Sequence, residues 1–276
     1  MQRTLEGFCR RSRACTDVLD DHLTPIFCIM EWIDDGIVLS AHRHGETSAV
    51  VALLTREHGR HTGLARGATG RRRGIYESGN SVRAHWRGRL SEHLGTLTCE
   101  LTGSVAAGLL DDRSRLAGLA AACAVAESAL PDRVPCPQVY AALKSLMAQL
   151  LAGTSWTGGY VEWELRLLAD LGFGLDLSRC AATGSTDQLA YVSPRSGRAV
   201  CLSAGAPYRD RLLRLPLFLI TDTAPVTAAD VFDGLTLTGY FLERHVYGAS
   251  ERALPPARLR LVERLGRKTG GHGGGA

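Results

Sequence analysis

The chain has 276 residues and a mass of 29.7 kDa, which is enough for two modest domains. Hydrophobic residues make up 45% and charged residues 22%, so we expect a packed core and exclude a disordered or collagen-like chain. The net charge is only +4, which indicates a polyanionic partner only if the positive charge is concentrated. The longest apolar stretches, such as 217–220, are far too short for a membrane-spanning helix of about 20 residues, so we expect no membrane partner.

Residues 1–29 differ from the rest of the chain, because they are polar and irregular and lack the apolar core of a signal peptide. A second methionine, Met30, directly precedes the first strand-like segment. We therefore interpret 1–29 as a disordered or mis-started extension. The eight cysteines are irregularly spaced, which excludes a secreted disulfide scaffold and favours the cytoplasm.

Residues 30–110 have the pattern of short strands separated by turn signals, with one longer loop at 70–80. Five strands are expected, near Ile37–Leu39, Ala49–Leu54, His61–Ala68, Val82–Leu90 and Leu94–Leu101. Five short strands with mostly tight connections predict a small closed barrel of the OB-fold type. Such barrels commonly bind single-stranded nucleic acid across one face and the flanking loops.

The positive charge is concentrated in this barrel. Residues 56–93 contain nine arginines against three glutamates, a net charge of +6, and histidines and aromatic residues are interleaved with them. We predict DNA binding by a loop clamp and by residues on the strand face, the alternative being a solvated face of an arginine-rich protein. The predicted DNA-binding residues are Arg60, Arg66, Arg71, Arg72, Arg73, Arg83, Arg87 and Arg89.

Two aromatic residues in the same stretch are candidates for stacking on bases, Tyr76 and Trp86. Strand alternation places Arg83, His85, Arg87 and Arg89 on one face and Trp86 on the other. We therefore favour a core position for Trp86. The histidines at 42, 44, 58 and 61 are interpreted as surface hydrogen-bonding groups at loops or strand ends.

Residues 111–266 differ in composition, with long segments rich in alanine and leucine at helical spacing. Helices are expected over Ser114–Leu130, Cys136–Gly153, Tyr160–Leu171, Thr227–Val246 and Pro255–Leu265. The overall fold class is therefore α+β, with an N-terminal barrel followed by a mainly helical domain. A glycine-rich tail, 267–276, has little to bury and is expected to be disordered.

An insertion at 176–205 resembles a small ribbon, with a strand pair near 189–193 and 198–202. A structural zinc site needs four thiolate or imidazole ligands, commonly as two C-x-x-C pairs. Here Cys180 is followed at that spacing by Thr183, and Cys201 by Ala204. We expect no metal and no other cofactor, because two sulfurs cannot enclose a tetrahedral zinc ion.

Motifs of enzyme chemistry are missing from the sequence. Neither lysine, Lys144 or Lys268, lies in a phosphate-binding P-loop, and no H-E-x-x-H or G-x-S-x-G sequence occurs. The acidic pairs at 34–35 and 111–112 lie at expected element boundaries, where capping or strand termination is their simplest role. The sequence thus favours a non-catalytic protein.

Several segments together resemble the bacterial RecO family of DNA repair proteins. They are Met30–Trp32, Gly36–Leu39, His44–Glu46, Leu53–Gly59, the run Leu165–Leu177 followed by Cys180, Tyr191–Pro194 and Ser196–Gly197. The resemblance covers nearly all of 30–265. The departures at Thr183 and Ala204 concern only the four-cysteine zinc site that some members of the family have.

The resemblance implies a mediator of recombinational repair, present in the cytoplasm and associated with the nucleoid. It implies binding of single- and double-stranded DNA, annealing of complementary strands, and loading of RecA, together with RecR, onto strands coated by single-stranded-DNA-binding protein. It also implies a small apolar pocket, rimmed by arginine, for the acidic tail of that coating protein. Arg133 and Arg166 are candidates for the rim, although both fit solvated helix-surface positions better. An RNA-binding barrel and a scaffold for acidic protein tails remain alternatives.

Overall fold

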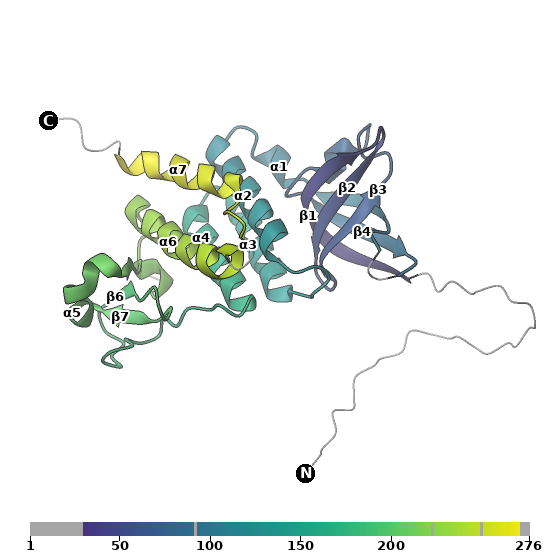
Figure 1. Ribbon diagram of the computed structural model, residues 1–276. Coiled ribbons are helices and arrows are strands. Elements are labelled where there is room, and N and C mark those ends of the chain that lie inside the picture. The colour runs from purple at the N-terminus through teal and green to yellow at the C-terminus, as the bar shows by residue number, and fades with distance from the viewer. Residues whose placement is uncertain (1–29, 91–92, 222–223, 249–250, 271–276) are drawn as a thin grey trace, which may run out of the picture.

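The computed structural model describes residues 30–90, 93–221, 224–248 and 251–270. Figure 1 shows a strand-rich part next to a larger helical part, with the small sheet of the insertion at the far side of the helices. Three interpretations drawn from the sequence concern residues outside the described ranges: the predicted extension 1–29, the end of the predicted tail at 271–276, and Glu92 of the arginine-rich stretch.

The first five strands form a closed barrel in the order β1-β2-β3-β5-β4, which confirms the predicted architecture. All neighbours are antiparallel except β3 and β5, which pair in parallel near Leu64 and Thr96. The strands are β1 (Met30–His44), β2 (Ser48–Thr55), β3 (Gly59–Ala65), β4 (Ser81–Gly88) and β5 (Thr96–Gly103).

Strand β1 is much longer than the sequence pattern predicts, and it holds the barrel together. Its first half pairs with β4, from Met30 opposite Gly88 to Ile37 opposite Ser81, and its second half pairs with β2. A bulge between Val38 and Ser40 bends the strand where it changes partner. The 15-residue strand therefore belongs to both walls of the barrel.

Alternation along β4 decides which side chains fill the barrel. Trp86 is buried, and its indole Nε1 donates a hydrogen bond to the carbonyl of Leu94 (3.0 Å), so the predicted core position is confirmed. Arg83, His85 and Arg87 alternate with the buried residues and are exposed, as predicted. Tyr76 is also buried in the barrel core, so the expectation that it offers a stacking surface is wrong.

The helical part contains the expected helices with shifted bounds. They are α2 (Arg113–Ala129), α3 (Pro137–Ala152), α4 (Trp156–Asp170), α6 (Ala228–Phe241) and α7 (Pro256–Gly270), and they are preceded by a short helix that the sequence pattern does not predict, α1 (Val105–Gly108). The long helix expected up to Val246 changes after α6 into a π-helical turn, η4 (Leu242–Tyr247). Asp112 caps α2 by accepting hydrogen bonds from the N–H groups of Ser114 and Arg115, which is the boundary role predicted for that acidic pair.

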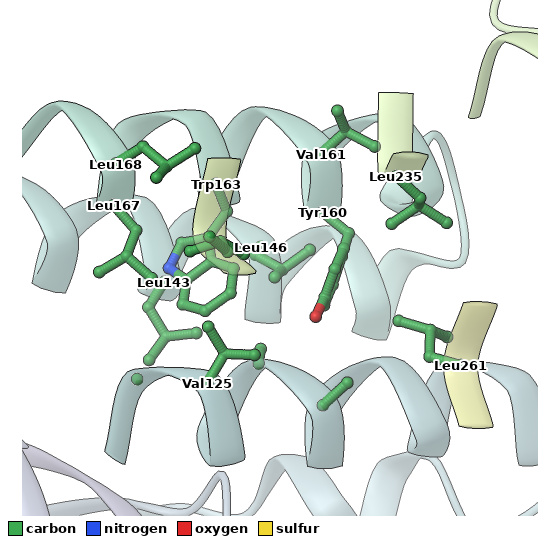
Figure 2. Close-up of a cluster of buried hydrophobic side chains, with 14 of the residues drawn as sticks. Val125, Leu143, Leu146, Tyr160, Val161, Trp163, Leu167, Leu168, Leu235 and Leu261 are labelled. Atoms are coloured by element: carbon green, nitrogen blue, oxygen red, sulfur yellow. The ribbon is translucent and has the colours of Figure 1, made fainter. Parts of the chain in front are cut away.

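Large apolar side chains from α2, α3 and α4 interlock between these helices (Figure 2). Tyr160 and Trp163 are buried at the centre of this apolar cluster, and Leu261 joins the cluster from α7. The core extends into the outer wall of the barrel, because α2 packs on β1 and β2 around Ile37 and Leu54. The barrel interior forms a second hydrophobic cluster of its own, around Val51, Leu53 and Trp86, so the helices pack on the barrel without entering it.

The insertion forms a three-stranded sheet in the order β7-β6-β8, one strand more than the predicted pair. The elements of this region are β6 (Leu189–Val192), β7 (Ala199–Cys201) and α5 (Leu202–Gly205), followed beyond the predicted end at 205 by η2 (Ala206–Arg211), β8 (Leu213–Arg214) and η3 (Leu217–Leu219). Among the described helices, none combines the length and the apolar character needed to span a bilayer.

Candidate nucleic-acid interface

Four of the predicted arginines lie together in the segment after β3. Arg66 follows the strand directly, and Arg71, Arg72 and Arg73 lead into a short 3-10 helix, η1 (Arg73–Tyr76). All four are exposed. We call Arg66, Arg71, Arg72 and Arg73 the basic loop.

Hydrogen bonds fix the base of the basic loop on both sides. Thr69 donates through its N–H to the carbonyl of Thr47 (3.3 Å) and through its hydroxyl to that of Glu46 (3.0 Å), which ties the loop to the β1–β2 turn. Asn80 is buried and donates from its side-chain amide to the carbonyl of Gly74 (2.7 Å). With Tyr76 in the core, the loop is anchored while its arginines point outward.

Electrostatically the basic loop is uncompensated. Within the described residues its four guanidinium groups form no ion pair with a carboxylate. A groove of about 460 Å³ runs beside it, and both Arg43 of β1 and Arg73 line that groove, together with Glu77. Arg43 lies outside the arginine-rich stretch, and only the pairing of β1 with β2 brings it to this end of the barrel.

The arginines on β4 have the opposite surroundings. Arg83 forms an ion pair with Asp35 (3.1 Å) and faces Glu100 across the β4–β5 pair. Arg87 and His85 both approach Glu31, at 3.9 and 3.6 Å. Carboxylates from the neighbouring strands thus neutralise much of the charge that the sequence places on this face.

Arg89 lies beyond the end of β4 and is exposed. Together with Arg87 and His93 it lines a small recess of about 290 Å³ at the end of the barrel that holds Met30 and Gly88. A recess of this size with two arginines suits one phosphate group. This end is opposite to the one that carries the basic loop.

Arg60 does not lie on the strand face with the others. Its side chain forms an ion pair with Asp132 (2.9 Å) and donates from Nε to the carbonyl of Leu130 (2.9 Å), and it is only 19% exposed. Arg60 thus links β3 to the segment that follows α2. The eight predicted residues therefore divide into the basic loop, the compensated strand β4, the recess at Arg89, and a junction residue.

The sequence pattern gives no sign of an aromatic stack near the recess. The rings of Trp32 and His58 stack with centroids 4.3 Å apart, and Asp34 accepts a hydrogen bond from Nδ1 of His58 (3.0 Å). Asp34 is buried and Asp35 is half-buried, so the two carboxylates of this acidic pair point in different directions. His61 is buried rather than at the surface as expected.

In the insertion, Cys180 and Cys201 lie together. The N–H of Cys201 donates to Sγ of Cys180 (3.2 Å), and Thr183 Oγ1 lies 3.7 Å from Sγ of Cys201. Burial raises the pKa of the Cys180 thiol, but hydrogen bonds from Thr183, Cys201 and Ala182 outweigh it and bring the pKa to about 6. Among the described residues no cluster of three or more metal-ligating side chains forms, so these donors do not fit tetrahedral zinc.

A second groove, of about 710 Å³, lies where β3 meets the ends of α2 and α4 and the segment around η4. Its lining combines apolar, basic and polar side chains with one carboxylate: Arg60, Glu127, Ser128, Ala129, Leu130, Pro131, Leu171, Phe173, His245, Val246 and Arg252. Phe173 is 38% exposed and stacks on His245 with centroids 4.9 Å apart. Neither Arg133 nor Arg166 lines this groove; Arg133 donates to the carbonyl of His93 instead (3.1 Å).

Comparison with known proteins connects these features to a family. A family model described as "Recombination protein O N terminal" matches residues 30–105, and one described as "Recombination protein O C terminal" matches residues 110–255. The DNA repair protein RecO of Rhodospirillum rubrum is 53% identical over 246 residues, which cover 87% of this chain and 98% of that protein. That of Rhodospirillum centenum is 55% identical over 238 residues, covering 85% of this chain and 94% of that protein.

Proposed function

Because this chain belongs to the Recombination protein O family of DNA repair proteins, we propose that it is a non-catalytic mediator of recombinational repair that binds DNA through its barrel. It binds single- and double-stranded DNA, anneals complementary strands, and acts at the nucleoid. With RecR it helps to load RecA onto strands coated by single-stranded-DNA-binding protein.

The observation that carries this proposal is the basic loop. Four exposed arginines without a carboxylate partner among the described residues, held on an anchored loop, can each neutralise a backbone phosphate and release its counterion. Arginine also grips phosphate with two parallel hydrogen bonds. Binding of this kind depends on backbone charge rather than on sequence, as a protein that acts on any broken chromosome needs.

Annealing follows from the same electrostatics. Two complementary strands repel each other through their phosphates, and arginines on the basic loop lower that repulsion while leaving the bases free to pair. No bond to the DNA is made or broken, so the proposal requires neither a nucleophile nor a metal ion. We also propose that the protein acts without zinc, and metal analysis of the purified chain should then find far less than one zinc per molecule.

We propose that the acidic, apolar tail of single-stranded-DNA-binding protein binds in the groove of about 710 Å³ beside β3 and the ends of α2 and α4. Phe173 and Leu171 offer apolar contact and Arg252 offers positive charge, whereas Arg60 in the same lining is already paired with Asp132. The arginine that we propose for this groove differs from the candidates Arg133 and Arg166, because the groove is assembled from β3, the ends of α2 and α4, and the segment around η4.

The proposal is tested by annealing two labelled complementary oligonucleotides with the full chain over a salt series. The variant Arg71→Ala/Arg72→Ala/Arg73→Ala should anneal much more slowly than the parent protein, and the salt dependence should become shallower by about 2 in the log–log plot at ~0.7 per phosphate. The exposed variant His42→Ala, on the barrel but outside the basic loop, serves as a matched control.

Three outcomes separate the alternatives. Equal annealing by the triple variant and the parent contradicts the role of the basic loop. Binding of RNA as tightly as DNA, without annealing, favours an RNA-binding barrel. No salt-dependent binding of either nucleic acid favours a scaffold for acidic protein tails.

A further inference from the structure

Three aromatic rings form a continuous stack at the end of the barrel that is opposite to the basic loop. Trp86 and Trp32 are nearly parallel, with centroids 5.9 Å apart and planes 14° apart. Trp32 and His58 are closer, at 4.3 Å and 11°. Stacked aromatic pairs of this geometry are favourable beyond the area that they bury.

The strand order fixes the sequence of rings in the stack. Trp32 lies directly opposite Trp86 in the β1–β4 pair, and β2, on the other side of β1, leads into the turn that carries His58. Trp32 therefore lies between the other two rings. The stack runs from the core outward, because Trp86 is buried whereas Trp32 is half-buried and the His58 side chain is 34% exposed.

The outermost ring is held rigidly. Asp34 is buried, and its Oδ2 accepts hydrogen bonds from Nδ1 of His58 (3.0 Å) and from the N–H of Glu57 (2.8 Å). The N–H of His58 donates to the hydroxyl of Thr55 (3.1 Å). Both the ring and its backbone are thus fixed before any ligand arrives, which lowers the entropy cost of binding.

The stack is supported from the side by His61. This ring is edge-on to both Trp32 (5.0 Å, 85°) and Trp86 (4.9 Å, 74°). It is buried, and neither of its ring nitrogens has a hydrogen-bond partner within the part of the chain that the structure describes. Because its ring is edge-on to both indoles, His61 acts here as an aromatic spacer that keeps them parallel.

We propose that the His58 ring is a stacking platform for one unpaired nucleobase, which extends the Trp86–Trp32–His58 stack by one ring. Every base has a flat π-face, so such a platform tolerates any sequence. Arg56 is exposed on the same turn and adds positive charge to it. This inference rests on the proposed function and adds to it a base-contacting site, separate from the phosphate-binding basic loop.

The test compares two oligonucleotides of equal length and charge, oligo-dT and an oligomer of abasic sites, by fluorescence anisotropy with the full chain. The parent protein should bind oligo-dT about 5- to 100-fold more tightly, the range expected for one stacked base. Binding of oligo-dT should also quench part of the tryptophan fluorescence, because Trp32 lies next to the platform.

Two variants at position 58 identify the ring. His58→Ala should lose the preference for oligo-dT and keep its affinity for the abasic oligomer, whereas His58→Phe, which keeps a flat ring, should retain the preference. His85→Ala is the matched control, because it removes an exposed histidine of the same barrel whose ring does not stack on Trp32 among the described residues.

The outcomes distinguish this inference from the proposed function. Equal, salt-sensitive binding of both oligomers by the parent protein overturns the platform and leaves phosphate binding intact. A His58→Ala variant that still prefers oligo-dT also overturns it. If neither oligomer binds at low salt, the proposed function itself is wrong.

Discussion

The basic loop and strand β4 contain arginines from the same stretch of sequence, yet they differ in what surrounds them. Arg71 and Arg72 have no carboxylate partner among the described residues, whereas Arg83 and Arg87 lie next to Asp35 and Glu31 of β1. An arginine that is already paired must give up an ion pair to bind a phosphate. The total number of arginines therefore does not predict how strongly a surface binds nucleic acid. The number of arginines that lack a carboxylate partner is the better predictor.

The same distinction extends into the interior, where the effects are larger. Arg258 of α7 is almost fully buried and makes a two-pronged ion pair with Glu164 of α4, at 2.7 and 2.8 Å. It also donates to the hydroxyl of Thr238 (3.1 Å) and the carbonyl of Leu235. This pair joins three helices.

Removing one partner of this buried pair is the largest effect that we predict. Arg258→Ala leaves the buried Glu164 carboxylate without its counter-charge, although the hydroxyl of Thr238 still donates to it. This should lower the free energy of unfolding by about 3 to 5 kcal/mol. Urea unfolding measures this loss. The folded fraction of this variant should bind DNA with the same salt dependence as the parent protein. A shallower salt dependence would contradict a purely structural role of Arg258.

The buried His61, which is held neutral in the folded protein, should make stability depend on pH. Burial, reinforced by Arg133 and His58, lowers the pKa of His61 from 6.5 to about 4. Since the unfolded chain binds this proton more readily, the stabilisation is complete above pH 6.5 and is lost as pH falls towards 4. The loss is at most about 3 kcal/mol.

Urea unfolding at pH 7 and pH 4.5 tests the prediction for His61. The parent protein should lose stability over this interval, and His61→Phe should lose much less, because it keeps the ring contacts and removes the proton. Replacing the exposed His42 by alanine is the control. An unchanged pH dependence in His61→Phe means that other groups cause it.

The smallest predicted effect is a gain. Glu31→Gln/Asp35→Asn removes the carboxylates that compensate β4 and frees Arg83 and Arg87 to contact phosphate. DNA affinity should rise, and the salt dependence should steepen by up to about 1.4 at ~0.7 per phosphate. Anisotropy titrations over a salt series measure both. The matched variant Glu77→Gln, next to the basic loop, should change the slope by less.

The sequence was sufficient for the barrel and for most of the helices, because alternation along β4 and helical spacing are local patterns. Pairing across the barrel is not local. Asp35 meets Arg83 only because β1 is long enough to pair with β4, and no nearby residue of the sequence reports that register. For the same reason Arg60 was grouped with the strand face, although Asp132, far along the chain, holds it at the junction.

The aromatic stack was missed for a related reason. Alternation correctly placed Trp86 inside the barrel, but it could not show that Trp32 and His58 continue its stack outward. Tyr76 was misassigned because it lies in a loop, where no periodicity indicates which side chains turn inward.

The central claim, that unpaired arginines rather than arginines in general bind DNA, is tested most directly by two charge-matched variants. Arg71→Ala/Arg72→Ala and Arg83→Ala/Arg87→Ala each remove two positive charges from the same barrel. In single-stranded DNA titrations over a salt series, we predict that the loop variant lowers the log–log slope by about 1.4, at ~0.7 per lost phosphate contact, and that the β4 variant leaves it nearly unchanged. Equal losses of slope in the two variants would contradict the claim.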